Sequence, residues 1–145
     1  MRLTTFTDYS MRVLIYLALH PEDELVTSAD IAVAHGISKN HLMKVVHYLG
    51  QQGYVETVRG KSGGVRLGMQ PEQINLGQLV RGTESSTSLV ECFAADSSRC
   101  RIEPACALRG ILQRALQAFY AVLDGYTLAD VMRNRDQLAA LLKVA

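Results

Sequence analysis

Residues 38–67, SKNHLMKVVHYLGQQGYVETVRGKSGGVRL, decide the fold of this 145-residue chain. Apolar residues in their first half recur at helical spacing, which predicts an amphipathic helix with Ser38 as its N-cap. A shorter helix is expected before it, with Ser28 as N-cap and an end at Gly36. Two short helices joined by a tight glycine-containing turn, the second polar and basic on its outer face, are typical of a helix-turn-helix. That outer face carries Lys39, Asn40, His41, Lys44 and His47.

The second half of this stretch predicts a β-hairpin, or wing. Residues 54–59 alternate like a strand, residues 60–64 form a glycine-rich turn, and residues 65–67 return as a second strand. The turn lacks the G-x-x-x-x-G-K-[ST] spacing of a nucleotide-binding loop, and no apolar strand leads into it. Three cations flank it: Arg59, Lys61 and Arg66.

Charge is distributed unevenly along the chain, although the formal net charge is only +1. Residues 36–68 carry five basic side chains against Glu56 alone, whereas residues 1–35 carry two arginines against five acids. A local basic patch is expected at a polyanion site, and the alternative is a solvated face. The helix-turn-helix and wing pattern favours double-stranded DNA as the polyanion.

The predicted DNA contacts follow from this arrangement. We expect the N-terminal part of the second helix in or beside the major groove, with Asn40 and His41 at base edges, and the wing cations at phosphates or in the minor groove. A symmetric dimer would read an inverted repeat with half-sites about 10–11 bp, or a multiple, apart. The predicted contact residues are Ser28, Ser38, Lys39, Asn40, His41, Lys44, Arg59, Lys61 and Arg66.

The rest of the chain predicts a mainly α fold around this small β-hairpin. Helices are expected over residues 5–20 and 76–83, with a loop over 84–89 and a long helix over 105–123. The apolar stripe of the long helix is too extensive for a small winged domain to cover, so a helix of a second chain is expected on it, with packing within the chain as the alternative. Thr127 is expected to cap a short helix, and an amphipathic segment runs on to Leu142. The predicted domains are residues 1–82, a winged helix-turn-helix, and residues 83–145, a cysteine loop, a dimerisation helix and C-terminal helices.

The chain has three cysteines, Cys92, Cys100 and Cys106, all within fifteen residues. A closed set of disulfides would leave one of the three thiols unpaired. The sequence also lacks the C-x2-C pair that is typical of a structural zinc site. Three thiolates in one loop suit an iron–sulfur cluster whose fourth ligand comes from elsewhere. Ordinary or redox-active thiols and a zinc-stabilised module are the alternatives. An enzyme with a cysteine nucleophile is not expected, because every histidine lies at or before His47.

The composition is that of a cytoplasmic protein. No run approaches the roughly 18 apolar residues that span a bilayer. Asp8 and Arg12 interrupt the apolar positions near the N-terminus, and no small-residue cleavage site follows, so a signal peptide is not expected. In the cytoplasm thiols stay reduced and available to metal.

Four segments together resemble one family, the Rrf class of winged-helix regulators, and in particular its nitric-oxide-sensing iron–sulfur repressors. They are residues 1–18, residues 37–67, the LVECF…CRIEPACALRGIL segment and the DGYTLADV segment. The resemblance covers essentially the whole chain. It implies a homodimeric DNA-binding repressor with the cluster bound just before the dimerisation helix. Nitrosylation of the cluster by nitric oxide would release operator DNA. The alternative is an iron–sulfur-biogenesis or thiol-redox regulator on the same scaffold.

The resemblance also bears on the fourth ligand. A cluster-biogenesis relative uses a histidine three residues after the third cysteine, but Arg109 stands there and cannot be a ligand. The resemblance implies a 4Fe-4S cluster, with 2Fe-2S as the alternative, and Asp8 of the partner subunit as the fourth ligand. The other reading of Asp8 is a first-turn acid paired with Arg12. The first cysteine gap is longer than in some relatives, which leaves room for local acids instead: Glu91, Asp96 or Glu103.

Overall fold

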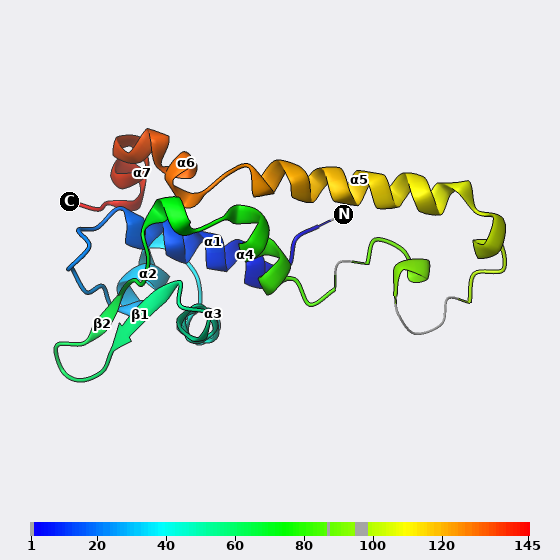
Figure 1. Cartoon of the computed structure of the whole chain (residues 1–145). Helices are drawn as coiled ribbons and strands as arrows, with labels where there is room; N and C mark the ends of the chain where they lie inside the picture. Colours follow the sequence, from blue (N-terminus) through cyan, green and yellow to red (C-terminus); the bar gives the residue numbers. More distant parts are fainter. Residues whose placement is uncertain (1, 87, 95–98) are drawn as a thin grey trace.

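The computed structural model describes residues 2–86, 88–94 and 99–145. It is mainly helical with one two-stranded antiparallel hairpin, which confirms the predicted fold class (Figure 1). The α-helices are α1 (Thr5–Ala18), α2 (Ser28–His35), α3 (Lys39–Gln51), α4 (Leu76–Thr83), α5 (Ala107–Asp124), α6 (Leu128–Val131) and α7 (Arg135–Leu142). The strands are β1 (Val55–Val58) and β2 (Gly64–Leu67). Short 3-10 turns are η1 (Pro71–Gln73), η2 (Glu91–Phe93), η3 (Glu103–Ala105) and η4 (Met132–Asn134).

The helix-turn-helix forms as predicted except at the start of α2. The hydroxyl of Ser38 accepts the His41 N–H and caps α3. Gly36 ends α2 in the left-handed conformation, with φ of 63°, which favours glycine. The N-cap of α2 is Thr27, so the prediction of Ser28 was wrong. Thr27 wins because Asp30, three residues later, completes a reciprocal capping box with it.

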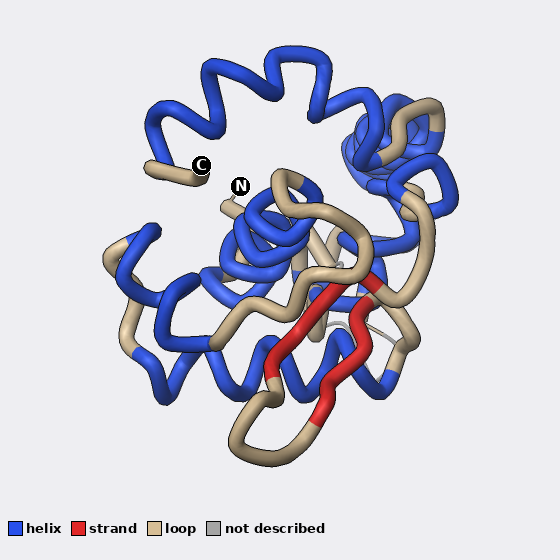
Figure 2. Tube along the Cα trace, turned by 90° about the vertical axis from the view of Figure 1, so that its left-hand side faces the viewer, coloured by secondary structure: helices blue, strands red, loops and turns tan. Residues whose placement is uncertain are grey.

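The wing has a fixed register in which Glu56 faces Arg66 and Thr57 faces Val65. Val55 and Val65 are buried, so this face of the hairpin closes the core. Gly60 has a φ of 110°, which only glycine adopts without strain, and it starts the turn after Arg59. Figure 2 shows this turn extending outward from the helices, as a DNA-binding wing requires.

The core lies between α1, α3 and the base of the wing, and the C-terminal helices close it. The best-buried side chains come from almost every element of this region. Arg135, which begins α7, donates to the carbonyl oxygens of Ala18 and Leu19 at the end of α1. The segment after α5 therefore packs on the winged-helix region. The predicted boundary between two domains at residue 82 stays a prediction. The best-buried leucines and isoleucines are Leu14, Ile31, Leu42, Leu49, Ile74, Leu79 and Leu128.

Helix α5 extends beyond the winged-helix region and carries the cysteine segment at its far end (Figure 1). Tyr120 is its one buried residue, and Leu108, Ile111 and Val122 are 57%, 51% and 62% exposed. Within the described residues, the chain therefore leaves much of the apolar stripe of α5 exposed. No described helix combines the length and apolarity needed to cross a bilayer.

Most predicted boundaries hold within two residues. Helix α4 begins and ends where expected, but α1 ends at Ala18 instead of residue 20. Helix α5 begins at Ala107 and not at Ala105, because Glu103–Ala105 forms a separate 3-10 turn. Cys106 has an extended backbone between the two and is the N-cap of α5. A predicted cluster ligand thus marks the start of the long helix.

Candidate DNA interface and cysteine loop

The outer face of α3 is polar and exposed, as predicted. Its inner stripe, Leu42 to Leu49, is almost fully buried against α1 and α2, which holds the helix axis in place. The side chains of Lys39, Asn40, His41 and Lys44 are exposed. A helix anchored on one face and cationic on the other can enter a major groove without rearrangement.

A groove separates α3 from the wing, and it brings together residues from three elements. Ser28 at the start of α2, His47 of α3 and Arg59 after β1 all line it. His47 was on the predicted outer face of α3 but not among the predicted contacts. Its position three residues after Lys44 on the same helical face was a signal that could have found it. A DNA backbone lying between helix and wing would meet all three side chains.

On its other side, α3 contacts the first turns of α1. The ring of His41 lies 6.4 Å from that of Tyr9, and the ring of Tyr48 makes an edge contact with Phe6 at 5.4 Å. These aromatic contacts fix α1 against the helix that carries most of the predicted DNA contacts. Tyr9 is therefore a neighbour of the interface that the charge pattern did not indicate.

The wing cations differ in their surroundings. The Nε of Arg66 donates to the Glu56 carboxylate across the hairpin at 2.9 Å, and this hydrogen bond raises the pKa of Arg66. Arg59 and Lys61 are exposed, and neither has an acidic partner in the part of the chain that the structure describes. Arg59 and Lys61 can thus neutralise phosphates directly, whereas Arg66 first has to leave Glu56.

The three cysteines lie on short turns that join α4 to α5, and each is half-buried. Cys92 belongs to η2, Cys100 precedes η3, and Cys106 caps α5. The backbone N–H of Glu103 donates to the Cys100 carbonyl, and that of Cys106 donates to the Glu103 carbonyl. Cys106 therefore stands directly before the first turn of the 18-residue helix α5.

Arg109 holds the loop together. Its guanidinium donates to the carbonyl of Cys92 at 3.4 Å and lies 3.7 Å from the Glu103 carboxylate. The Glu91 carboxylate accepts the N–H of Arg99. Two of the predicted local alternative ligands thus already have partners, and the third, Asp96, lies outside the described residues.

Asp8 lies on α1, where its carboxylate pairs with Arg12 at 2.8 Å. This is the first-turn pairing expected from sequence, and it leaves Asp8 about half exposed. Within the described residues, no three His, Cys, Asp or Glu side chains come close enough to hold a metal ion. The donor chemistry of the loop fits an iron–sulfur cluster, because it offers three thiols on one segment, with Arg109 bonded to the Cys92 carbonyl and Cys106 at the start of α5.

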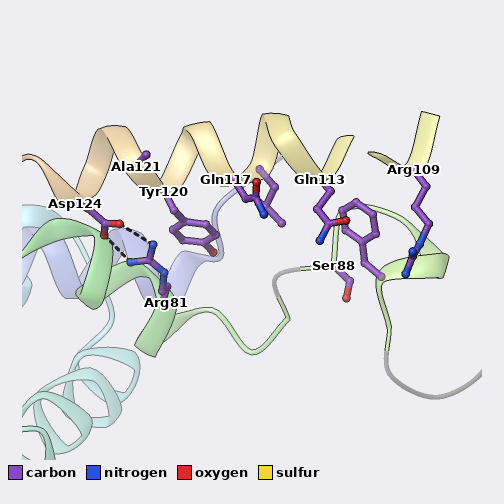
Figure 3. Close-up of a pocket in the computed structure, with 10 residues that line it drawn as sticks. Arg81, Ser88, Arg109, Gln113, Gln117, Tyr120, Ala121 and Asp124 are labelled. Atoms are coloured by element: carbon purple, nitrogen blue, oxygen red, sulfur yellow. Dashed lines mark hydrogen bonds and ion pairs between the residues drawn. The ribbon is translucent and has the colours of Figure 1, made fainter. Parts of the chain in front are cut away.

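A joint between α4 and α5 anchors the long helix. Arg81 makes two hydrogen bonds to Asp124, at 2.5 and 2.8 Å, and its guanidinium lies 4.4 Å from the centre of the Tyr120 ring (Figure 3). The hydrogen bond from Arg81 lowers the pKa of Asp124, and burial raises that of Tyr120. A Cβ on Gly77 would overlap the Asp124 carboxylate, so glycine is needed for this close approach.

The comparisons with known proteins agree with this architecture. The model of the Rrf2 family, described as an iron-dependent transcriptional regulator, matches residues 3–134. The chain, a winged helix-turn-helix with a long helix that follows a cysteine loop, is thus a transcription regulator. It belongs to the Rrf2 family. The prediction that it is a DNA-binding regulator and not an enzyme is confirmed.

Curated relatives match over the full length. The HTH-type transcriptional regulator NsrR of Bacillus subtilis (strain 168) is 54% identical over 99% of both chains. The NsrR of Bacillus licheniformis is 52% identical over 98% of this chain and 99% of its own. The predicted resemblance is confirmed, and the chain is similar to NsrR-type regulators within the family.

Solved structures share the fold. CymR, the global cysteine regulator of B. subtilis, superposes with a TM-score of 0.72 at 29% identity, over 90% of this chain and 95% of its own. IscR of T. potens gives a TM-score of 0.72 at 25% identity, over 92% of this chain and 88% of its own. The scaffold is therefore common to regulators that are named for different roles.

Proposed function

We propose that the protein is a homodimeric repressor that binds an inverted-repeat operator and senses nitric oxide through a 4Fe-4S cluster. Cys92, Cys100 and Cys106 of one subunit and Asp8 of the partner subunit would hold the cluster. The observation that carries the proposal is the cysteine loop at the start of α5, in a chain about half identical to NsrR-type regulators over its full length. The iron of such a cluster would be the group that reacts with nitric oxide.

The exposed stripe on α5 supports the dimer. Three of its apolar side chains are more than half exposed, and an apolar stripe of this length is normally covered by a partner helix. A two-fold axis that crosses α5 at a right angle would set the two recognition helices on one side of the assembly, as an inverted repeat requires.

The position of Asp8 supports a ligand from the partner. In its own chain Asp8 lies on α1, while α5 carries the cysteines beyond the winged-helix region (Figure 1). A carboxylate is a harder and weaker iron ligand than a thiolate, so it leaves a more exchangeable position. Because α1 packs on α3, a ligand on α1 would connect the sensor directly to the DNA-contacting helix.

A thiol-redox or cluster-biogenesis regulator on the same scaffold is the second candidate. The fold that the chain shares with CymR and IscR supports this second candidate. Against it, Arg109 stands where a histidine ligand would be and is engaged with the Cys92 carbonyl and Glu103.

The test is anaerobic purification followed by titration with nitric oxide, with the visible spectrum and the affinity for a candidate promoter measured together. We expect a brown protein with one broad absorption band, which loses both the band and its DNA affinity. Several absorption maxima would point to 2Fe-2S. Colourless protein that binds DNA equally well with and without nitric oxide would overturn the cluster and leave a zinc- or thiol-based regulator.

A further inference from the structure

The last residues of α4 form a junction between three helices. Residues 81–84, which we call the α4 terminus, contact α5, α3 and α1 in turn. Arg81 holds Asp124, the last residue of α5, through two hydrogen bonds. The chain leaves the α4 terminus for the cysteine loop directly after Glu84 and returns from it along α5 to Asp124. Residues 85–123, which we call the cysteine excursion, are therefore joined to the α4 terminus at both ends. Figure 3 shows the Arg81–Asp124 contact at the second end.

The second contact joins the α4 terminus to the recognition helix α3. The Tyr48 hydroxyl donates to the Gly82 carbonyl at 2.6 Å. A Cβ at residue 82 would lie 2.6 Å from that hydroxyl oxygen, so the contact depends on glycine. Tyr48 lies four residues after Lys44 on α3, and its ring also packs on Phe6.

The third contact joins the α4 terminus to the first turn of α1. One carboxylate oxygen of Glu84 accepts the backbone N–H of Thr4 at 2.8 Å, the Thr4 hydroxyl at 3.1 Å and the Thr7 hydroxyl at 2.5 Å. The Thr7 hydroxyl also lies 2.9 Å from that of Thr83. Thr7 is fully buried, so this network fixes the turn that carries Asp8.

We propose that the α4 terminus relays the state of the cysteine loop to the recognition helix, with Tyr48 and Glu84 as positioning residues. This rests on the proposed function, because the signal originates at the cysteines. A shift of the cysteine excursion acts on residues 81–84, since both of its ends are held there. The Tyr48–Gly82 hydrogen bond then passes that shift to α3. The Glu84 network passes it to α1, which packs on α3.

The size of the expected effect follows from the bonds involved. One neutral hydrogen bond changes an equilibrium about fivefold in net terms. Allosteric coupling is the ratio of operator affinities in the two states of the sensor, so removal of the contact should reduce that ratio by this factor. The hydroxyl itself faces α4 and not DNA, so the operator affinity of the cluster-free protein should stay within about twofold.

The first experiment measures operator affinity of the iron–sulfur-loaded and cluster-free dimer for Tyr48→Phe and Gly82→Ala. Both remove the hydrogen bond, one from each side, and Tyr48→Phe keeps the ring. Tyr126→Phe is the control, because its hydroxyl has no hydrogen-bond partner among the described residues. We expect an affinity ratio about fivefold below wild type for both variants, with an unchanged visible spectrum. A wild-type ratio in both would overturn the relay.

The second experiment needs no cluster and no DNA. Amide hydrogen exchange of the cluster-free protein is compared for Glu84→Ala and Glu84→Gln. Gln keeps an acceptor oxygen for Thr4 and Thr7, so it should restore part of the protection that Ala loses. We expect Glu84→Ala to speed exchange about fivefold or more in α3 near Tyr48, which Glu84 does not touch. Unchanged protection of α3 overturns the relay. If wild type shows no affinity difference between its two states, the proposed sensor function fails, and the exchange result decides the relay by itself.

Discussion

Arg59 and Arg66 have the same charge and both belong to the wing, but of the two only Arg66 has a carboxylate partner among the residues that the structure describes. An exposed cation gains the full benefit of phosphate neutralisation, whereas a paired cation first gives up its hydrogen bond. The difference could not be predicted from sequence, because it depends on the strand register that sets Glu56 opposite Arg66.

Arg59→Ala should therefore weaken operator binding more than Arg66→Ala. We expect the slope of log affinity against log salt to fall by about one for Arg59→Ala, and by clearly less for Arg66→Ala. Gel-shift or anisotropy titrations at several salt concentrations measure both, with Lys44→Ala for comparison. Equal salt slopes for the two arginine variants would contradict the importance of the Glu56 pair.

Asp8 provides the second prediction at this scale. Asp8→Ala should shorten the lifetime of the cluster under anaerobic dialysis. The stability of the cluster-free protein should change little, because its exposed pair with Arg12 is worth only about 0.5 kcal/mol. Glu103→Gln and Glu91→Gln are the matched controls. If either control loses the cluster faster than Asp8→Ala, a local acid is the fourth ligand instead.

At the scale of elements, periodicity predicted nearly every helix, and local competition decided the details. The α3 stripe and the α4 boundaries were predictable because their apolar residues recur at one period and their caps are polar. Ser28 was wrongly predicted as the N-cap of α2, although Asp30, three residues after Thr27, was visible in the sequence. The contacts of Glu84 could not be predicted, because they join residues about 80 apart.

Glu84 gives a pH-dependent prediction. Partial burial acts to raise its pKa, but hydrogen bonds from Thr7 and Thr4 hold the pKa below its ordinary value. A carboxyl whose pKa is lower when folded stabilises the protein above its unfolded pKa of about 4.3, and this contribution is lost as pH falls through the folded pKa. Glu84→Gln should thus cost about 1 kcal/mol at pH 7 and less at pH 3.5. Urea unfolding of the cluster-free protein measures this, and an equal cost at both pH values would contradict it.

At the scale of the whole molecule, α5 is the feature that a single chain leaves incomplete. Its stripe was predictable from sequence, and the structure adds that the C-terminal helices pack on the winged-helix region and leave that stripe open. What covers it could not be derived from one chain, because in the proposed dimer the covering surface belongs to the partner subunit.

Ile111→Glu should convert dimers to monomers. Burying an apolar side chain of this size contributes about 2 kcal/mol per copy, and an unpaired charge at its position opposes association further. We expect the dimer dissociation constant to rise at least about tenfold. Leu141→Glu is the matched control, since Leu141 is 80% exposed on α7. Sedimentation analysis measures the effect, and a dimer as tight as wild type would exclude α5 as the interface.

The projection of α5 past its own first helix also has a genetic consequence. If cysteines of one subunit complete their site with Asp8 of the other, an allele without Asp8 and an allele without Cys106 are each inactive alone. In a cell that carries both, a mixed dimer has one intact site, with cysteines from the chain that lacks Asp8 and with Asp8 from the chain that lacks Cys106. Its other site lacks both residues. The two alleles should therefore complement each other, whereas two alleles that both lack a cysteine should not.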